Sequence, residues 1–145
     1  MNILYEIRES QGKGKGLFTK QFIKKGEIIW SSKNDNNVIE INNDKLLEYL
    51  NSYNNIEVLD ILDHMYCYNG KCYDIRNCDL KYTNHSLDPT SYVDSENNSV
   101  AIRDIEIGEE ITEDYRTYDN YLPEYYKLMT KYKGGTWSEL VVKWL

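Results

Sequence analysis

The strongest constraint on the fold of this chain comes from residues 65–75, which read Met-Tyr-Cys-Tyr-Asn-Gly-Lys-Cys-Tyr-Asp-Ile. Asn69 and Gly70 stand between two short runs rich in aromatic residues, which favour β-strands. Both residues tolerate the positive φ angles of a two-residue turn, so the segment predicts a β-hairpin with Tyr68 opposite Lys71. Because an isolated hairpin is only marginally stable, other elements of the chain must cover it.

The hairpin register places Cys67 opposite Cys72, and Tyr66 opposite Tyr73. The two cysteines would form a non-hydrogen-bonded pair with α-carbons about 4.5 Å apart. A disulfide can bridge that separation. We nevertheless expect reduced thiols that pack against one another, and the oxidised pair remains the alternative.

Short strand-forming runs separated by polar turns recur along the chain. With 145 residues, the chain is most simply one domain. The pattern predicts a mainly β fold with short helices. The expected strands outside the hairpin are residues 3–8, 17–20, 28–30, 91–93 and 99–102, and the run that follows Gly108.

Two regions carry helical patterns. In residues 42–63, Asn42 or Asn43 can cap a first helix, because a short polar side chain accepts hydrogen bonds from free first-turn amides. Near the C-terminus, Pro123 can occupy the first turn of another helix. The apolar residues expected on the buried faces of the two insert helices are Leu46, Leu47 and Leu50, and then Ile56, Leu59 and Leu62.

Composition narrows the class of partner. Acidic residues outnumber basic ones by 24 to 17, giving a net charge of -7. This balance argues against direct nucleic-acid binding, which favours a basic face, and suits a basic protein or peptide. No apolar run approaches the roughly 20 residues needed to span a membrane. The N-terminus lacks the pattern of a secretory signal, so we expect an intracellular protein, cytoplasmic or nuclear.

Glycines occupy alternate positions in the stretch Gly12-Lys13-Gly14-Lys15-Gly16. Such a stretch lets the backbone turn tightly and approach a ligand. A phosphate-binding loop would require Gly-Lys-Ser/Thr at the start of a helix. Because Leu17 and Phe18 read as a strand, a nucleotide-phosphate site is disfavoured, and a plain flexible turn remains the alternative.

Two further blocks are Asn84-His85-Ser86 and residues 107–115, Ile-Gly-Glu-Glu-Ile-Thr-Glu-Asp-Tyr. Taken alone, His85 could be a buried, satisfied histidine or a base. No Ser or Cys nucleophile arrangement surrounds it, so triad chemistry has little support.

The glycine stretch and these two blocks, in this order, resemble the SET domain family of protein lysine methyltransferases over roughly residues 5–118. The resemblance implies small β-sheets with a C-terminal pseudoknot and a helical insert at about 43–63. It divides the chain into a SET domain at 1–118 and a post-SET-like flanking segment at 119–145.

The resemblance also implies methyl transfer from S-adenosylmethionine to a lysine ε-amine of a protein. Tyr115 falls on the family's catalytic tyrosine. Tyr66, Tyr92 and Tyr118 would line the substrate channel. The residues implied to bind the cofactor are Lys13, Gly14, Lys15, Asn84, His85, Tyr115 and Trp137, of which Trp137 would cover the adenine, with Tyr118 and Tyr121 as alternatives and core packing equally open.

Three positions depart from the family pattern. Ser31-Ser32 stand where many members carry a channel aromatic, and Thr90 stands where many have Asn. Leu87 replaces a cysteine that donates to a zinc cluster in many members, so we predict no metal.

Two readings of function remain. The first is the methyltransferase, with a histone tail, a ribosomal protein or another basic protein as substrate. The second is a non-catalytic SET-fold module that binds a basic protein or peptide. The apolar tail at 141–145 could pack within one chain or across a homodimer.

Overall fold

A computed structural model describes residues 1–144, so the last residue of the predicted flanking segment, Leu145, lies outside the described residues. The chain forms two compact units, each built from two separate stretches. Unit 1 comprises Met1–Asn36 and Asp79–Asp114, and unit 2 comprises Asn37–Cys78 and Tyr115–Leu145. Small sheets and short helices confirm the predicted mainly β class. The proposed boundary at residue 118 stays a prediction.

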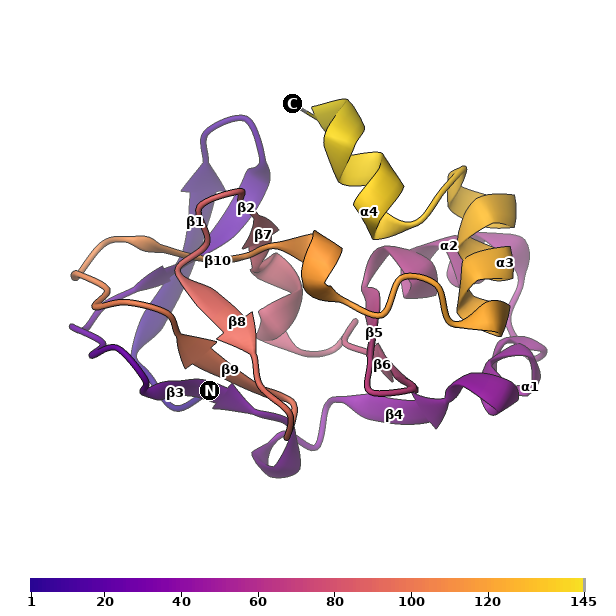
Figure 1. The fold of residues 1–145 in the computed structure, drawn as a ribbon, viewed down its shortest axis with the longest axis horizontal. Coiled ribbons are helices and arrows are strands. Elements are labelled where there is room, and N and C mark those ends of the chain that lie inside the picture. The colour runs from indigo at the N-terminus through magenta and orange to yellow at the C-terminus, as the bar shows by residue number, and fades with distance from the viewer. Residues whose placement is uncertain (145) are drawn as a thin grey trace. The chain divides into compact units, whose positions relative to one another are not determined.

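Unit 1 holds two sheets (Figure 1). A four-stranded sheet has the order β1-β2-β10-β7, and a three-stranded sheet has the order β3-β9-β8. Buried aliphatic side chains of these strands and their connections, among them Leu17, Ile29 and Ile111, form its core. The bounds are β1 Tyr5–Ser10, β2 Gly14–Thr19, β3 Ile28–Ser31, β7 Asn84–His85, β8 Ser91–Val93, β9 Asn98–Ala101 and β10 Glu110–Glu113, with short 3-10 turns η1 Ser32–Asn34 and η3 Asp79–Tyr82.

The glycine stretch is more regular than predicted. It was expected to be a loop before a strand at 17–20, but β2 already begins at Gly14 and pairs with β1. The turn at its start uses positive φ angles of 76° at Gly12 and 75° at Gly14, which cost glycine little. Lys15 is therefore held in a sheet rather than in a mobile loop.

Unit 2 contains a three-stranded sheet of order β4-β6-β5 and all four α-helices of the described residues (Figure 1). Its core includes Leu46, Ile61, Met65, Tyr125 and Met129. The bounds are β4 Ile39–Asn42, β5 Met65–Tyr68, β6 Lys71–Asp74, α1 Leu46–Leu50, α2 Asn55–Asp63, α3 Pro123–Lys133 and α4 Trp137–Leu140, with 3-10 turns η2 Asn43–Lys45, η4 Tyr115–Thr117 and η5 Val141–Trp144.

The hairpin prediction is confirmed in its register. Tyr68 pairs with Lys71 across the turn, where Asn69 has φ 51° and Gly70 has φ 78°. The expectation of reduced thiols in this hairpin is wrong in this structure. Cys67 and Cys72 lie opposite one another with Cα atoms 4.1 Å apart and form a disulfide.

The buried faces of the insert helices differ from the predicted ones. Leu47, Ile56 and Leu59 are exposed, by 51%, 79% and 37%. In α1, Leu46 and Leu50 are buried and Tyr49 packs against the same core, so Leu47 lies outside the buried face. The residues that α1 and α2 bury are Leu46, Leu50, Val58, Ile61 and Leu62.

Capping also differs at the first insert helix. The Asn42 side chain makes no capping bond, and Asn43 Oδ1 instead accepts from the Tyr125 backbone amide of α3 at 3.2 Å. The second helix is capped by Asn54, which forms a reciprocal capping box with Glu57. The Asn43 side chain thus links the start of α3 to the insert and does not cap the first insert helix.

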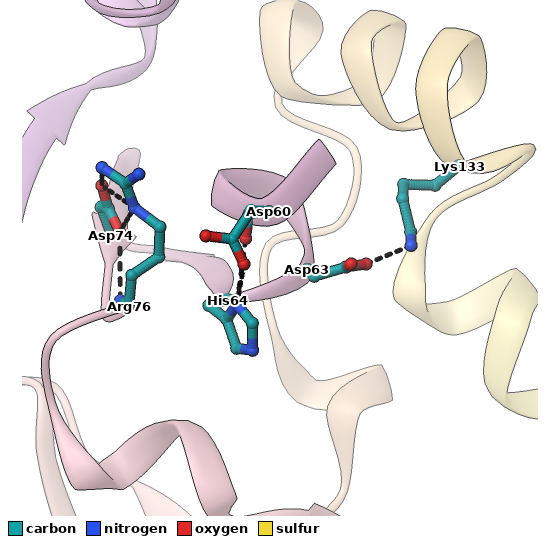
Figure 2. Close-up of polar contacts among 6 residues, drawn as sticks. All are labelled: Asp60, Asp63, His64, Asp74, Arg76 and Lys133. Carbon is teal, nitrogen blue, oxygen red and sulfur yellow. Dashed lines mark hydrogen bonds and ion pairs between the residues drawn. The ribbon is translucent and has the colours of Figure 1, made fainter. Parts of the chain in front are cut away.

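Polar contacts reinforce unit 2 (Figure 2). Arg76 Nη2 donates to the buried carboxylate of Asp74 at 2.9 Å, and the Tyr49 hydroxyl donates to the same carboxylate at 2.6 Å. Burial, together with that hydrogen bond, raises the pKa of Tyr49. Lys133 near the end of α3 pairs with Asp63 at the end of α2. The Asp74 contacts join β6 to α1 because Tyr49 belongs to that helix.

No helix in the described part of the chain has both the length and the apolar character needed to cross a membrane.

Candidate active site

A polar cluster in unit 1 gathers four of the predicted cofactor residues. Strand β7 lies parallel to β10, with Asn84 opposite Thr112 and His85 opposite Glu113. Asn84 Nδ2 donates to the Lys15 carbonyl at 3.0 Å. Lys13 Nζ donates to the His85 carbonyl at 3.1 Å. The glycine stretch and the Asn-His pair, about 70 residues apart in sequence, are therefore joined directly by hydrogen bonds.

Glu110 is a member of this polar cluster that the sequence reading did not single out. Its carboxylate accepts from Ser10 Oγ at 2.7 Å and from Asn84 Nδ2 at 2.8 Å. A Cβ atom at Gly16 would lie 2.6 Å from Glu110 Oε2, so glycine is needed there for the carboxylate to fit. The sequence feature that marks Glu110 is its place as the second Glu of the Gly-Glu-Glu run, at the start of β10.

His85 is buried and faces an acidic neighbour. Its Nδ1 lies 3.7 Å from Asp114 Oδ1, and the side chains of both residues are largely shielded from solvent. The backbone next to it is held by a bond from the Ser86 amide to the Glu113 carbonyl at 2.9 Å. Because the neighbouring backbone is held by this bond, the His85 carbonyl is a fixed hydrogen-bond acceptor.

An aromatic cluster in unit 2 gathers Tyr66, Tyr73, Tyr115, Tyr118 and Trp137. The ring centroid of Tyr115 lies 5.5 Å from that of Tyr118 and 5.6 Å from that of Trp137. The Tyr66 ring lies 5.1 Å from both Tyr118 and Tyr73. These separations are in the range at which aromatic pairs attract one another. The structure therefore brings the predicted catalytic tyrosine together with two of the three predicted channel residues.

Trp137 lies in the core of unit 2. Thr136 caps α4 in a capping box with Glu139, which sets the position of the tryptophan at the first turn. Trp137 Nε1 donates to the Met65 carbonyl at 3.0 Å, and the Tyr125 hydroxyl donates to the same oxygen at 3.2 Å. Burial raises the pKa of Tyr125. The core packing that the sequence left open is thus present, while contact with an adenine stays a prediction.

Asp119, shortly after Tyr115 in the chain, is hydrogen-bonded to the hairpin, and the sequence did not predict these contacts. The Asp119 amide donates to the Cys67 carbonyl at 2.7 Å. The Asp119 carboxylate accepts from the Gly70 amide at 3.2 Å. Asn120 Nδ2 donates to the Tyr118 carbonyl at 2.8 Å. No simple motif marks the two Asp119 contacts, because both depend on the fold of the hairpin.

Tyr92 is not brought into the aromatic cluster. It lies on β8 in unit 1 and is 45% exposed, whereas the other predicted channel residues belong to unit 2. Its place in a substrate channel stays a prediction. In residues 1–144, no group of three His, Cys, Asp or Glu side chains could hold a metal ion.

Comparison with known proteins identifies the fold. The SET domain family model matches residues 14–116. A Plasmodium falciparum protein proposed to be a histone methyltransferase is similar in structure, with a TM-score of 0.50 and 22% identity, over 79% of this chain and 95% of that one. No curated protein sequence matches this chain.

A second similar structure is the Neurospora SET domain protein DIM-5, a histone lysine methyltransferase. Its TM-score is 0.55, its identity is 17%, and the match covers 79% of this chain and 52% of DIM-5. This chain thus spans about half the length of DIM-5. At such identities the two structures support the fold alone. Because the family model matches well over half of the chain, this protein belongs to the SET domain family.

Proposed function

We propose that this protein is an S-adenosylmethionine-dependent protein-lysine N-methyltransferase. Membership of the SET domain family supports the proposal. The observation that carries it is the position of Tyr115, the residue that matches the family's catalytic tyrosine. Its ring contacts those of Tyr118 and Trp137 in the aromatic cluster, as an apolar site for a lysine side chain requires.

The residues of the polar cluster fit the amino-acid part of the cofactor. Carbonyl and carboxamide oxygens at Asn84 and His85 can accept from its ammonium, and Lys13 and Lys15 can attract its carboxylate. Gly14 has open space where a Cβ would stand, so its backbone is accessible. Bound there, S-adenosylmethionine would supply an electrophilic methyl group on sulfur.

The aromatic cluster suits the substrate lysine. A lysine must lose its proton before its nitrogen can attack, and an apolar environment disfavours the ammonium form and lowers the lysine pKa. Tyr66, Tyr118 and Tyr115 would provide that environment. The Tyr115 hydroxyl can also align the methyl group through weak C–H···O contacts. We assign Tyr115 no general-base role, because the proposal needs only its alignment of the methyl group.

We propose a basic protein as the substrate. The net charge of -7 favours encounter with a positively charged segment. A histone tail and a ribosomal protein satisfy this condition equally. Three further expectations stay predictions. They are an intracellular location, no direct binding of nucleic acid, and a homodimer formed through the C-terminal segment.

Calorimetric titration with S-adenosylmethionine, followed by transfer of labelled methyl groups to basic peptides, tests the proposal. We expect one-to-one binding by the wild type. Tyr115→Phe should retain cofactor binding and lose transfer by about 100-fold, the scale expected when reacting groups lose their alignment. Tyr126→Phe is the matched control, because it removes a hydroxyl from a tyrosine on α3 that is 41% exposed.

Two outcomes would contradict the proposal. Absence of cofactor binding by folded wild type, with basic peptides present, would favour the non-catalytic binding module. Equal transfer by Tyr115→Phe and Tyr126→Phe would remove the catalytic assignment of Tyr115 while leaving the cofactor site in place.

A further inference from the structure

The Glu110 carboxylate is the point at which three separate stretches of unit 1 meet. Ser10 at the end of β1 donates to Oε1 at 2.7 Å. Asn84 on β7 donates to Oε2 at 2.8 Å. Gly16 on β2 leaves the space that Oε2 occupies. Hydrogen bonds to a carboxylate are stronger than those between neutral groups, so these two bonds hold β1 and β7 to β10 beside Gly16.

These contacts also determine which way the Asn84 carboxamide points. Its nitrogen carries two hydrogens, and the two acceptors beside it are Glu110 Oε2 and the Lys15 carbonyl. A carbonyl and an ionised carboxylate can only accept. If the carboxamide were flipped, its oxygen would face two other acceptors, so the observed orientation is favoured. Asn84 Oδ1 is consequently directed away from both partners.

An acceptor oxygen held in this way has a chemical use. Unlike a rotating hydroxyl, an amide oxygen with its nitrogen bonded on two sides offers its lone pairs in one direction. Preorganised acceptors cost no reordering when a cation binds. In the proposed cofactor, the group that such an acceptor suits is the ammonium of the amino-acid part.

We propose that Glu110 is a positioning residue that acts through Asn84, keeping the Asn84 amide oxygen available to the ammonium of the cofactor. The inference rests on the proposed function for its ligand, but the orientation of Asn84 can be tested without any ligand. A residue with only a structural role would affect stability alone and would not distinguish between parts of the cofactor.

The test compares Glu110→Ala, Glu110→Gln and wild type with two ligands. The first ligand is S-adenosylmethionine. The second is methylthioadenosine, which lacks the amino-acid part. We expect Glu110→Ala to weaken S-adenosylmethionine binding about ten-fold, the effect of losing one charged hydrogen bond. Methylthioadenosine binding should be unchanged. Glu110→Gln should recover most of the affinity, because its amide oxygen can still accept from Asn84.

Glu109→Ala is the matched control. Glu109 precedes Glu110 and carries the same charge, but its carboxylate pairs with Arg103 at 2.8 Å. It should bind both ligands like the wild type. If Glu110→Ala unfolds, Glu110→Gln still supplies the comparison, through a smaller selective loss for S-adenosylmethionine.

Nuclear magnetic resonance of the Asn84 side-chain amide supplies the ligand-free readout. In wild type, its two amide protons should exchange slowly with solvent, and in Glu110→Ala they should exchange at least about ten-fold faster, because one acceptor is gone. Unchanged exchange, or equal losses for both ligands, would overturn the positioning role. If the Asn84 amide protons exchange as expected but wild type binds neither ligand, the positioning role would stand and the proposed function would be contradicted.

Discussion

The polar cluster of unit 1 and the aromatic cluster of unit 2 are held together by different physics. In the polar cluster, a hydroxyl, an ammonium and a carboxamide donate to a carboxylate and to backbone carbonyls at 2.7 to 3.1 Å. In the aromatic cluster, rings pack at centroid separations of 5.1 to 5.6 Å. Hydrogen bonds depend on individual atoms and their direction, whereas ring packing depends on volume and burial.

This difference determines how each cluster should respond to change. A substitution that exchanges donor for acceptor should damage the polar cluster even when its volume is conserved. A substitution that removes volume should damage the aromatic cluster even when no polar group is lost. Volume changes should therefore have their largest effect on stability in unit 2.

Trp137→Ala should have the largest effect, because it removes the most side-chain volume from the aromatic cluster. Trp137 is buried, contacts Tyr115, and satisfies the Met65 carbonyl. Its removal should lower the free energy of unfolding by about 3–5 kcal/mol, as for other buried large-to-small changes. Urea denaturation measures the loss, with Leu47→Ala on an exposed face as control. A cost below about 1 kcal/mol would show that Trp137 is poorly packed.

The hairpin disulfide is the covalent support of the aromatic cluster, since Tyr66 lies next to Cys67 on β5. Reduction should lower the free energy of unfolding by about 2 kcal/mol, the entropic value for a very short loop. Denaturation with and without a dithiol measures this effect, and mass spectrometry verifies oxidation. The Cys67→Ala/Cys72→Ala variant should not respond to the dithiol. Equal stability of oxidised and reduced wild type would restore the thiol interpretation.

Local signals predicted the fold well where structure depends on neighbouring residues. The Asn69-Gly70 turn determined the hairpin register because the turn and both strands lie within a few residues of one another. Pairing of β7 with β10 could not be derived from local patterns, since it joins Asn84 to Thr112. Hairpin geometry also could not decide the oxidation state of Cys67, because reduced and oxidised cysteines fit the same cross-strand pair.

The candidate site shows the same limit. Family resemblance predicted Asn84 and Tyr115, and the structure places each in a cluster with other predicted residues. Glu110 and Asp119 were missed because their roles depend on several strands meeting. Leu47 was misplaced because α1 packs Leu46, Tyr49 and Leu50 on the core, which leaves Leu47 exposed.

Two glycines offer a matched comparison between the units. In Gly16→Ala, the new Cβ would stand 2.6 Å from Glu110 Oε2, whereas in Gly135→Ala the nearest atom is Glu139 Cβ at 3.3 Å. Forcing the carboxylate away should cost about 1–2 kcal/mol by overpacking, and the change at Gly135 should cost less. Gly16→Ala should also weaken S-adenosylmethionine binding.

Thermal denaturation and calorimetric titration of the two glycine variants measure these effects. Equal stability costs, with cofactor affinity retained in both, would show that the carboxylate of Glu110 can move without affecting the site. The polar cluster would then resemble the aromatic cluster in depending on space rather than on direction.

Alkaline pH should affect the aromatic cluster through Tyr73. Burial, followed by the nearby Glu40 carboxylate, raises the pKa of Tyr73 to about 12. In the unfolded chain its pKa is about 10. Between these values the folded protein binds more protons than the unfolded one, so stability falls as pH rises. The contribution is fully present below pH about 10 and is lost as pH passes through about 12.

Urea denaturation of wild type and Tyr73→Phe at pH 9 and pH 11 isolates this contribution. Wild type should lose about 1 kcal/mol more than the variant between these conditions, a little under the 1.4 kcal/mol that one pKa unit represents. Comparing the two proteins removes the effects of Tyr49 and the other tyrosines. Parallel losses would mean that Tyr73 titrates in the fold as it does in water, and that the aromatic cluster does not exclude solvent from its hydroxyl.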